Sequence, residues 1–176
     1  MAPKKKLTKP LHLSTVTIAV ALTSNLGLTD DRWECFTESS RLPLSIKQRV
    51  RLCSGARSDA PLRCFAQTYL LGLTADQQIT LCQAASSDAP ARCFYSSLGK
   101  GITSDQIINL CTTATSTYPI QCFDHTAGFP ITLDQRINFC ANSSSEEPFS
   151  CFISHINSGL TWDQLLNLCT ENTLIS

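Results

Sequence analysis

Cysteine is the residue type in this sequence whose number and spacing indicate a chemical role. Ten cysteines occur in 176 residues, and 18-residue and 11-residue steps between successive cysteines alternate throughout. A dense, even set of cysteines is typical either of disulfides formed in an oxidising compartment or of metal sites. The ten are Cys35, Cys53, Cys64, Cys82, Cys93, Cys111, Cys122, Cys140, Cys151 and Cys169.

Two disulfide schemes are compatible with this spacing. One joins cysteines across the 18-residue steps, and the other joins cysteines across the 11-residue steps, such as Cys82 and Cys93. The 18-residue scheme uses every cysteine, whereas the 11-residue scheme leaves Cys35 and Cys169 unpaired, so parity favours the former. The favoured pairs are Cys35–Cys53, Cys64–Cys82, Cys93–Cys111, Cys122–Cys140 and Cys151–Cys169.

Metal binding is the competing use of these thiols. Zinc sites usually contain a close pair of ligands such as Cys-x-x-Cys, and the sequence has no such pair. Thiolates at the observed spacing would supply only two-ligand clusters. We therefore predict no metal site, and a metal-binding cysteine array stays as an alternative.

The other chemically versatile residues form no catalytic pattern. His12, His125 and His155 occupy unrelated positions, and the sequence has no glycine-rich phosphate loop, nucleophile elbow or His-Glu-x-x-His motif. We therefore expect no catalytic residue, no cofactor-binding residue and no cofactor. The protein is predicted not to be an enzyme.

One polar column recurs in register with the cysteines. Asparagine is a poor helix former, yet it occupies this column three times in succession. The column could link neighbouring units by hydrogen bonds, which is the interpretation we favour, or it could face a ligand. Its members are Arg51, Thr80, Asn109, Asn138 and Asn167.

The whole pattern has a 29-residue period. A phenylalanine follows the first cysteine of each 29-residue repeat, at Phe36, Phe65, Phe94, Phe123 and Phe152. A fixed period of this kind indicates structural units that stack on one another. We predict one repeat domain over residues 29–173, with units at 29–57, 58–86, 87–115, 116–144 and 145–173.

The first half of each unit is predicted to be a helix. A hydroxyl residue at its start is a good N-cap, and apolar residues recur at helical spacing, as in Leu62, Phe65 and Tyr69. Glycine or proline then ends the helix. The caps are Thr29, Ser58, Ser87, Ser116 and Ser145, and the terminating residues are Pro43, Gly72, Gly101, Pro130 and Gly159.

The second half of each unit begins with a capping box. A Ser or Thr is followed three residues later by Gln, so that each side chain satisfies a backbone donor of the other residue. In four units an Asp also lies in the first turn, where the helix dipole favours an anion. The pairs are Ser45 with Gln48, Thr74 with Gln77, Thr103 with Gln106, Thr132 with Gln135, and Thr161 with Gln164.

Two helices of roughly 11–13 residues form a hairpin, and one hairpin cannot bury its apolar face alone, so the units must stack. The prediction is an all-α fold, namely an α-solenoid of five tandem 29-residue helix-turn-helix (αα-hairpin) repeats cross-linked by disulfides. This layout resembles the cysteine-bridged helical-hairpin repeats related to tetratricopeptide proteins. It differs from them in unit length and cysteine spacing.

The N-terminus has the layout of a secretory signal. Four lysines within residues 4–9 precede a mostly apolar run from Leu11 to Leu22, and Ala19 and Ala21 form an A-x-A cleavage pattern. This run is short for a membrane span. A basic nuclear or nucleic-acid-binding tag is the alternative interpretation.

Export would divide the chain and change its charge. We predict a signal peptide over residues 1–21, ending no later than residue 24, a linker over 22–28 and a tail over 174–176. The mature chain would hold ten basic and fourteen acidic side chains, basic at the first unit and acidic beyond it, which disfavours nucleic acid as a partner. The sequon Asn142-Ser143-Ser144 matters only in a eukaryotic source.

These features together predict a class of function. Apolar residues make up 43% and charged residues 16% of the chain, which is not a disordered composition. We expect a secreted, extracellular or periplasmic, monomeric and non-enzymatic binding or scaffold module. Its expected partner is another protein or a surface glycan, without nucleic acid or a membrane span. A protease-resistant defence or toxin-like protein is the alternative, and a metal-binding array or an enzyme is a further one.

Overall fold

A computed structural model describes residues 30–141 and 143–171 of the chain. The predicted signal peptide, linker and tail lie outside the described residues, as do Thr29 and Asn142. The described part is all helical, with ten α-helices, two short 3₁₀ helices and no strand. The elements are α1 (Asp31–Glu38), η1 (Ser39–Arg41), α2 (Ile46–Cys53), α3 (Ala60–Gln67), α4 (Ala75–Cys82), α5 (Ala89–Ser97), α6 (Ser104–Cys111), α7 (Tyr118–His125), η2 (Thr126–Gly128), α8 (Leu133–Cys140), α9 (Glu147–Ser154) and α10 (Trp162–Glu171).

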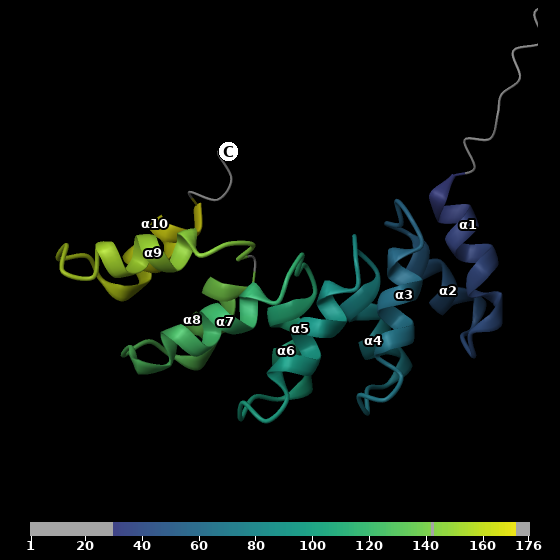
Figure 1. The fold of residues 1–176 in the computed structure, drawn as a ribbon, viewed down its shortest axis with the longest axis horizontal. Helices are drawn as coiled ribbons and strands as arrows, with labels where there is room; N and C mark the ends of the chain where they lie inside the picture. The colour runs from purple at the N-terminus through teal and green to yellow at the C-terminus, as the bar shows by residue number, and fades with distance from the viewer. Residues whose placement is uncertain (1–29, 142, 172–176) are drawn as a thin grey trace, which may run out of the picture.

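The α-helices form five hairpins that lie side by side in a curved row (Figure 1). Each odd-numbered helix packs against the even-numbered helix that follows it. The second helices of the hairpins, α2, α4, α6, α8 and α10, also pack one on the next along the whole row. The α-solenoid predicted from the 29-residue period is therefore confirmed.

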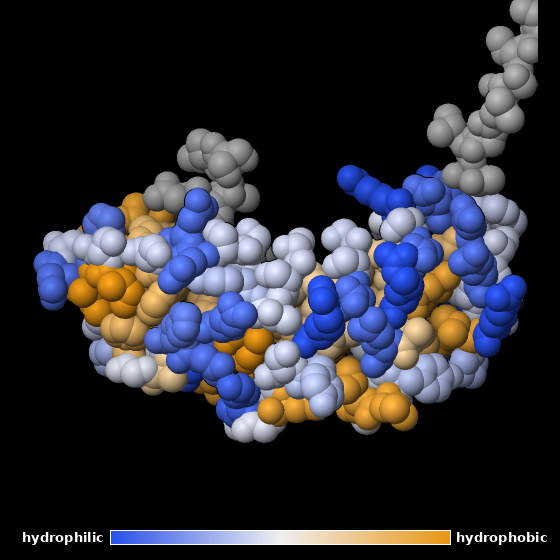
Figure 2. Space-filling model, viewed as in Figure 1, coloured by the Kyte–Doolittle hydropathy of each residue, from blue (hydrophilic) through white to orange (hydrophobic). Residues whose placement is uncertain are grey.

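One hydrophobic core runs through the row from Cys35 to Cys169. The phenylalanine that follows the first cysteine of a unit fills the space between the two helices, and Phe65, Phe94 and Phe152 are fully buried. Burying a side chain of this size contributes about 1.5–3 kcal/mol. Figure 2 shows that hydrophobic surface also remains at the lower edge of the molecule, where the turns between paired helices lie.

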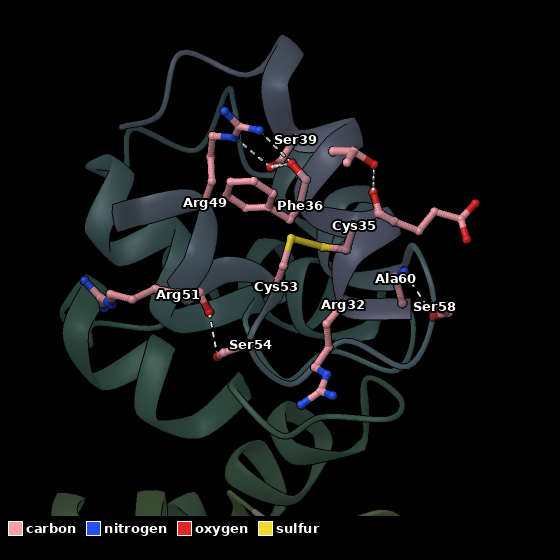
Figure 3. Close-up of a disulfide and its surroundings, with 12 residues drawn as sticks. Arg32, Cys35, Phe36, Ser39, Arg49, Arg51, Cys53, Ser54, Ser58 and Ala60 are labelled. Carbon is pink, nitrogen blue, oxygen red and sulfur yellow. Dashed lines mark hydrogen bonds between the residues drawn. A yellow bond between two sulfur atoms is a disulfide. The ribbon is translucent and has the colours of Figure 1, made fainter. Parts of the chain in front are cut away.

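A disulfide joins the two helices of every hairpin. The pairs are Cys35–Cys53, Cys64–Cys82, Cys93–Cys111, Cys122–Cys140 and Cys151–Cys169, each with 5.6 Å between the Cα atoms. These are the pairs of the 18-residue scheme, and no described cysteine is free. Five disulfides indicate an oxidising environment. In Figure 3, Cys35 and Cys53 meet between α1 and α2 beside Phe36.

The predicted capping boxes form at all five second helices. In α6 the Thr103 N–H donates to Gln106 Oε1 (2.9 Å), and the Gln106 N–H donates to Thr103 Oγ1 (3.3 Å). The serines predicted to cap the first helices also accept first-turn N–H groups, as Ser58 does from Ala60 (3.1 Å). They lie two residues before the first helical residue, so the predicted N-cap position is off by one: the residue after each serine, such as Asp59 in α3, is the N-cap and makes no side-chain cap bond.

The first helices end earlier than glycine and proline indicated and have 8 or 9 residues, and the second helices have 8 to 10, so both are shorter than the expected 11–13. A buried hydroxyl at the end of α3 donates back to the last turn, from Thr68 Oγ1 to the Phe65 carbonyl (2.7 Å). The Thr68 N–H donates to the same carbonyl (3.1 Å), so both donors of Thr68 close the last turn of α3. Gly72 instead lies in the following turn at φ +69°. Ser39, Ser97 and Thr126 donate in the same way at the ends of α1, α5 and α7.

Candidate binding groove

The polar column predicted from the sequence lies across the second helices. Its members belong to α2, α4, α6, α8 and α10 in turn, and these helices pack side by side. Arg51 and Thr80 are half-buried, whereas Asn109, Asn138 and Asn167 are exposed. The column is therefore a line of polar side chains on one surface of the solenoid.

The members of this column differ in their partners. Arg51 Nη1 donates to Asp76 Oδ1 (3.0 Å) and so links α2 to α4, which is the inter-unit bond expected of the column. Thr80 Oγ1 donates to the Asp76 carbonyl of its own helix (2.9 Å). Within residues 30–141 and 143–171, the side-chain amides of Asn109, Asn138 and Asn167 have no hydrogen-bond partner. The three asparagines therefore do not link the units.

A different pair of side chains makes two links between neighbouring second helices, and sequence reasoning missed it. Gln77 Nε2 donates to Asp105 Oδ1 of the next second helix (2.9 Å), and Gln135 Nε2 donates likewise to Asp163. These are the residues of the capping boxes and the aspartates of the first helical turns. Each Gln thus uses its oxygen within its own helix and its NH₂ group between helices. Their 28-residue spacing was the available signal.

The exposed part of the column opens into a groove of about 880 Å³ that crosses α4, α6 and α8. Thr80, Asn109 and Asn138 line it, one from each helix. Asp76 and Asp105 lie at its side, and its lining contains neither lysine nor arginine. Arg51 offsets the charge of Asp76, so the groove is polar with a negative charge at Asp105, and the amides of Asn109 and Asn138 are available to a ligand.

The geometry of the groove suits an extended ligand. Packed helices lie about 8–10 Å apart, so a groove over three helices spans roughly 16–20 Å. An extended polypeptide rises about 3.3 Å per residue, which corresponds to about five or six residues. Each asparagine amide presents one oxygen acceptor and an NH₂ donor, the same two functions that a peptide group offers.

The histidines give no sign of a second site. His125 packs beside Phe149 (5.1 Å between ring centroids), and His155 Nδ1 lies 2.9 Å from the Cys151 carbonyl oxygen. His12 lies outside the described residues. In the part of the chain that the structure describes, no group of three or more His, Cys, Asp or Glu side chains is arranged to hold a metal ion.

The shifted pKa values also lie away from the groove. The hydrogen bond from Gln67 Nε2 lowers the pKa of the Asp88 carboxyl, which Gln67 contacts across the α3–α5 interface. Burial raises the pKa of the Tyr118 hydroxyl and lowers the pKa of the Arg136 guanidinium. None of these groups lines the groove.

Comparison with protein-family models, with curated proteins and with solved structures found no match. None of the described helices is long and apolar enough to cross a bilayer. Inference about function therefore depends on the surface of this chain itself.

Proposed function

We propose that this chain is an exported, non-enzymatic binding module that holds an extended segment of another protein along the groove over α4, α6 and α8. The observation that supports it is that equivalent positions of neighbouring units contribute to the same groove. Thr80, Asn109 and Asn138 come from three consecutive units and line one groove. Neither asparagine amide is used inside the described fold.

The chemistry of the groove favours a polypeptide with basic side chains. Each asparagine amide can donate to one peptide carbonyl and accept from one peptide N–H. Asp76 and Asp105 also line the groove. Arg51 offsets the charge of Asp76, so of these two carboxylates it is Asp105 that steers a cationic partner toward the groove. Binding is therefore expected to weaken as the salt concentration rises.

The disulfides would lower the cost of binding. Each unit is locked by its own bridge, so the three helices that form the groove are ordered before a ligand arrives. Ordering a flexible site costs about 0.5–1.5 kcal/mol for each immobilised side chain. A preformed groove avoids much of this cost.

Selection of peptides from a displayed random library on the oxidised protein tests this function. We expect the selected peptides to be enriched in Lys and Arg. Replacing Asn109 and Asn138 together by Ala removes two amides from the groove, and one hydrogen bond contributes about 0.5–1.5 kcal/mol. The dissociation constant, measured by calorimetry, should therefore rise about 10- to 100-fold in the double variant.

Asn157→Ala is the matched control, because Asn157 is an exposed asparagine in the turn between α9 and α10. This variant should bind as the original protein does. Peptides whose affinity is unchanged in the double variant would place binding elsewhere and contradict the proposal. If glycans bind in the groove and peptides do not, the ligand class is wrong.

Export is proposed from the lysine-rich start, the apolar run and the pattern at Ala19 and Ala21. Sequencing of the protein recovered from outside the cytoplasm should give an N-terminus near Leu22. A protein that accumulates in the cytosol and still begins at Met1 would refute export.

A further inference from the structure

The two ends of the described row expose apolar positions that are more deeply buried in the other units. Val50 is 53% exposed, whereas the residues at the same position of the later units are at most 6% exposed. Those residues are Ile79, Ile108, Ile137 and Leu166. Within the described residues, units 2 to 5 have a preceding unit and unit 1 has none, so this position faces the preceding unit.

A second position shows the same trend at the first end. Trp33 is 63% exposed, whereas at the same position Ala91 and Ile120 are buried and Leu62 and Phe149 are half-buried. Trp33, Phe36 and Val50 line an open hollow of about 270 Å³ beside α1 and α2. The first end of the solenoid is thus an apolar surface with a recess large enough for an aliphatic side chain.

The last end of the row, at unit 5, exposes a different set of apolar positions. Leu168 is 44% exposed, whereas the same position in units 1 to 4 is at most 3% exposed, at Leu52, Leu81, Leu110 and Phe139. Leu160, in the turn before α10, is 42% exposed, and its equivalents are half-buried. These positions therefore face the following unit. Figure 2 shows hydrophobic surface at this end of the row.

The two ends are thus the two halves of the interface that joins consecutive units. Soluble solenoids usually end in capping units with a polar outer face, and neither described end has one. The net charges of the two terminal units are also opposite in sign. Unit 1 carries six basic and four acidic side chains, whereas unit 5 carries four acidic side chains and no lysine or arginine.

We propose that copies of this chain associate head to tail, with unit 1 of one copy docking on unit 5 of another as each unit docks on its neighbour within the chain. Such an interface is heterologous and produces open filaments or closed rings. This differs from the monomer expected from the sequence. It does not depend on what the groove binds, because the groove lies over α4, α6 and α8, away from both ends.

Sedimentation velocity of the full oxidised protein over a concentration series tests the proposal. The weight-average mass should rise with concentration past the dimer. Val50→Asp and Leu168→Asp each place a carboxylate in the apolar contact, so each variant should weaken association by at least about tenfold. Leu70→Asp is the control, because Leu70 is 96% exposed in the turn between α3 and α4 and should not affect assembly.

Mixing the two variants identifies the geometry. Val50→Asp keeps an intact last end and Leu168→Asp keeps an intact first end, so the mixture should give one-to-one heterodimers and nothing larger. If circular dichroism or a free-thiol assay shows misfolding, Trp33→Asp and Leu160→Asp replace the pair. A protein that stays monomeric at every concentration overturns the proposal, including the case in which residues 1–29 or 172–176 cover the ends. The proposal is also overturned if the Leu168→Asp variant still forms dimers by itself, because its two copies would then be joined through their unit 1 surfaces.

Discussion

Removal of one disulfide should have consequences that depend on its place in the row. Replacing both Cys93 and Cys111 by Ala removes the bridge of unit 3, and replacing both Cys151 and Cys169 removes the bridge of unit 5. Both bridges close the same 18-residue separation. The chain-entropy model gives about 3 kcal/mol for a loop of this size, which is about a hundredfold in the equilibrium for opening the unit.

The two units differ in their neighbours. The helices of unit 3 pack against units on both sides, whereas unit 5 packs against unit 4 alone. In a linear array the stability is a sum of unit terms and nearest-neighbour interface terms. Opening unit 5 therefore costs one interface, and opening unit 3 costs two and leaves two shorter arrays.

Hydrogen exchange measured by mass spectrometry under native conditions distinguishes the two cases. Without the Cys151–Cys169 bridge, exchange should rise about a hundredfold in α9 and α10 and stay unchanged in α1 to α6. Without the Cys93–Cys111 bridge, protection should fall in α5 and α6 together with α4 and α7, which flank them. If each variant loses protection only in its own unit, the units are energetically independent and the reasoning fails. Uniform loss in both variants would refute it in the opposite direction, because the domain would be one cooperative block.

Further predictions concern the bridges, the caps, the core and pH. Peptide mapping without reduction should recover Cys82 joined to Cys64, and a Cys82–Cys93 peptide would refute the within-hairpin scheme. Thr103→Ala removes the hydroxyl of a capping box and should lower the free energy of unfolding by about 1 kcal/mol in calorimetry; an unchanged value would show that the cap contributes nothing. Phe94→Ala empties a fully buried position and should cost about 3–5 kcal/mol in denaturant unfolding, unlike Tyr95→Ala at an exposed neighbour. The pKa of Asp88 is lowered by Gln67, so its stabilising contribution is present above about pH 4 and is lost as the pH falls through the lowered value. NMR titration should show that pKa rising toward its ordinary value in Gln67→Ala, and no change would remove Gln67 as the cause.

The features that sequence predicted well are those with a local cause repeated in every unit. A capping box needs only a hydroxyl and a glutamine three residues apart, so Thr103 and Gln106 could be assigned without knowing what surrounds them. The phenylalanine after the first cysteine of each unit likewise fills one recurring space. Repetition supplies the evidence that a single segment lacks.

The missed features involve residues that have two roles. Thr68 was not recognised as a terminator because glycine and proline are the stronger breakers, although a hydroxyl can compete for the last carbonyls of a helix. Gln77 already had a role inside its own helix, so its second bond to Asp105 was not considered. Because the Gln–Asp bonds were not considered, links between units were assigned to the asparagines of the groove instead. Whether a polar column bridges two helices depends on how far each side chain reaches. The 29-residue period of the sequence gives no information about that distance.

The placement of the disulfides within hairpins also sets how far the chain can be stretched. Pulled from its ends, an oxidised unit can extend only over the 11-residue step between one bridge and the next, such as Cys53 to Cys64, because the 18-residue step inside each bridge is bypassed. At about 3.3–3.6 Å per residue that is roughly 36–40 Å per unit, plus the 5.6 Å across the bridge. A reduced 29-residue unit would reach roughly 96–104 Å. The oxidised protein therefore has a short, fixed limit of extension, and reduction would more than double the maximum length of each unit.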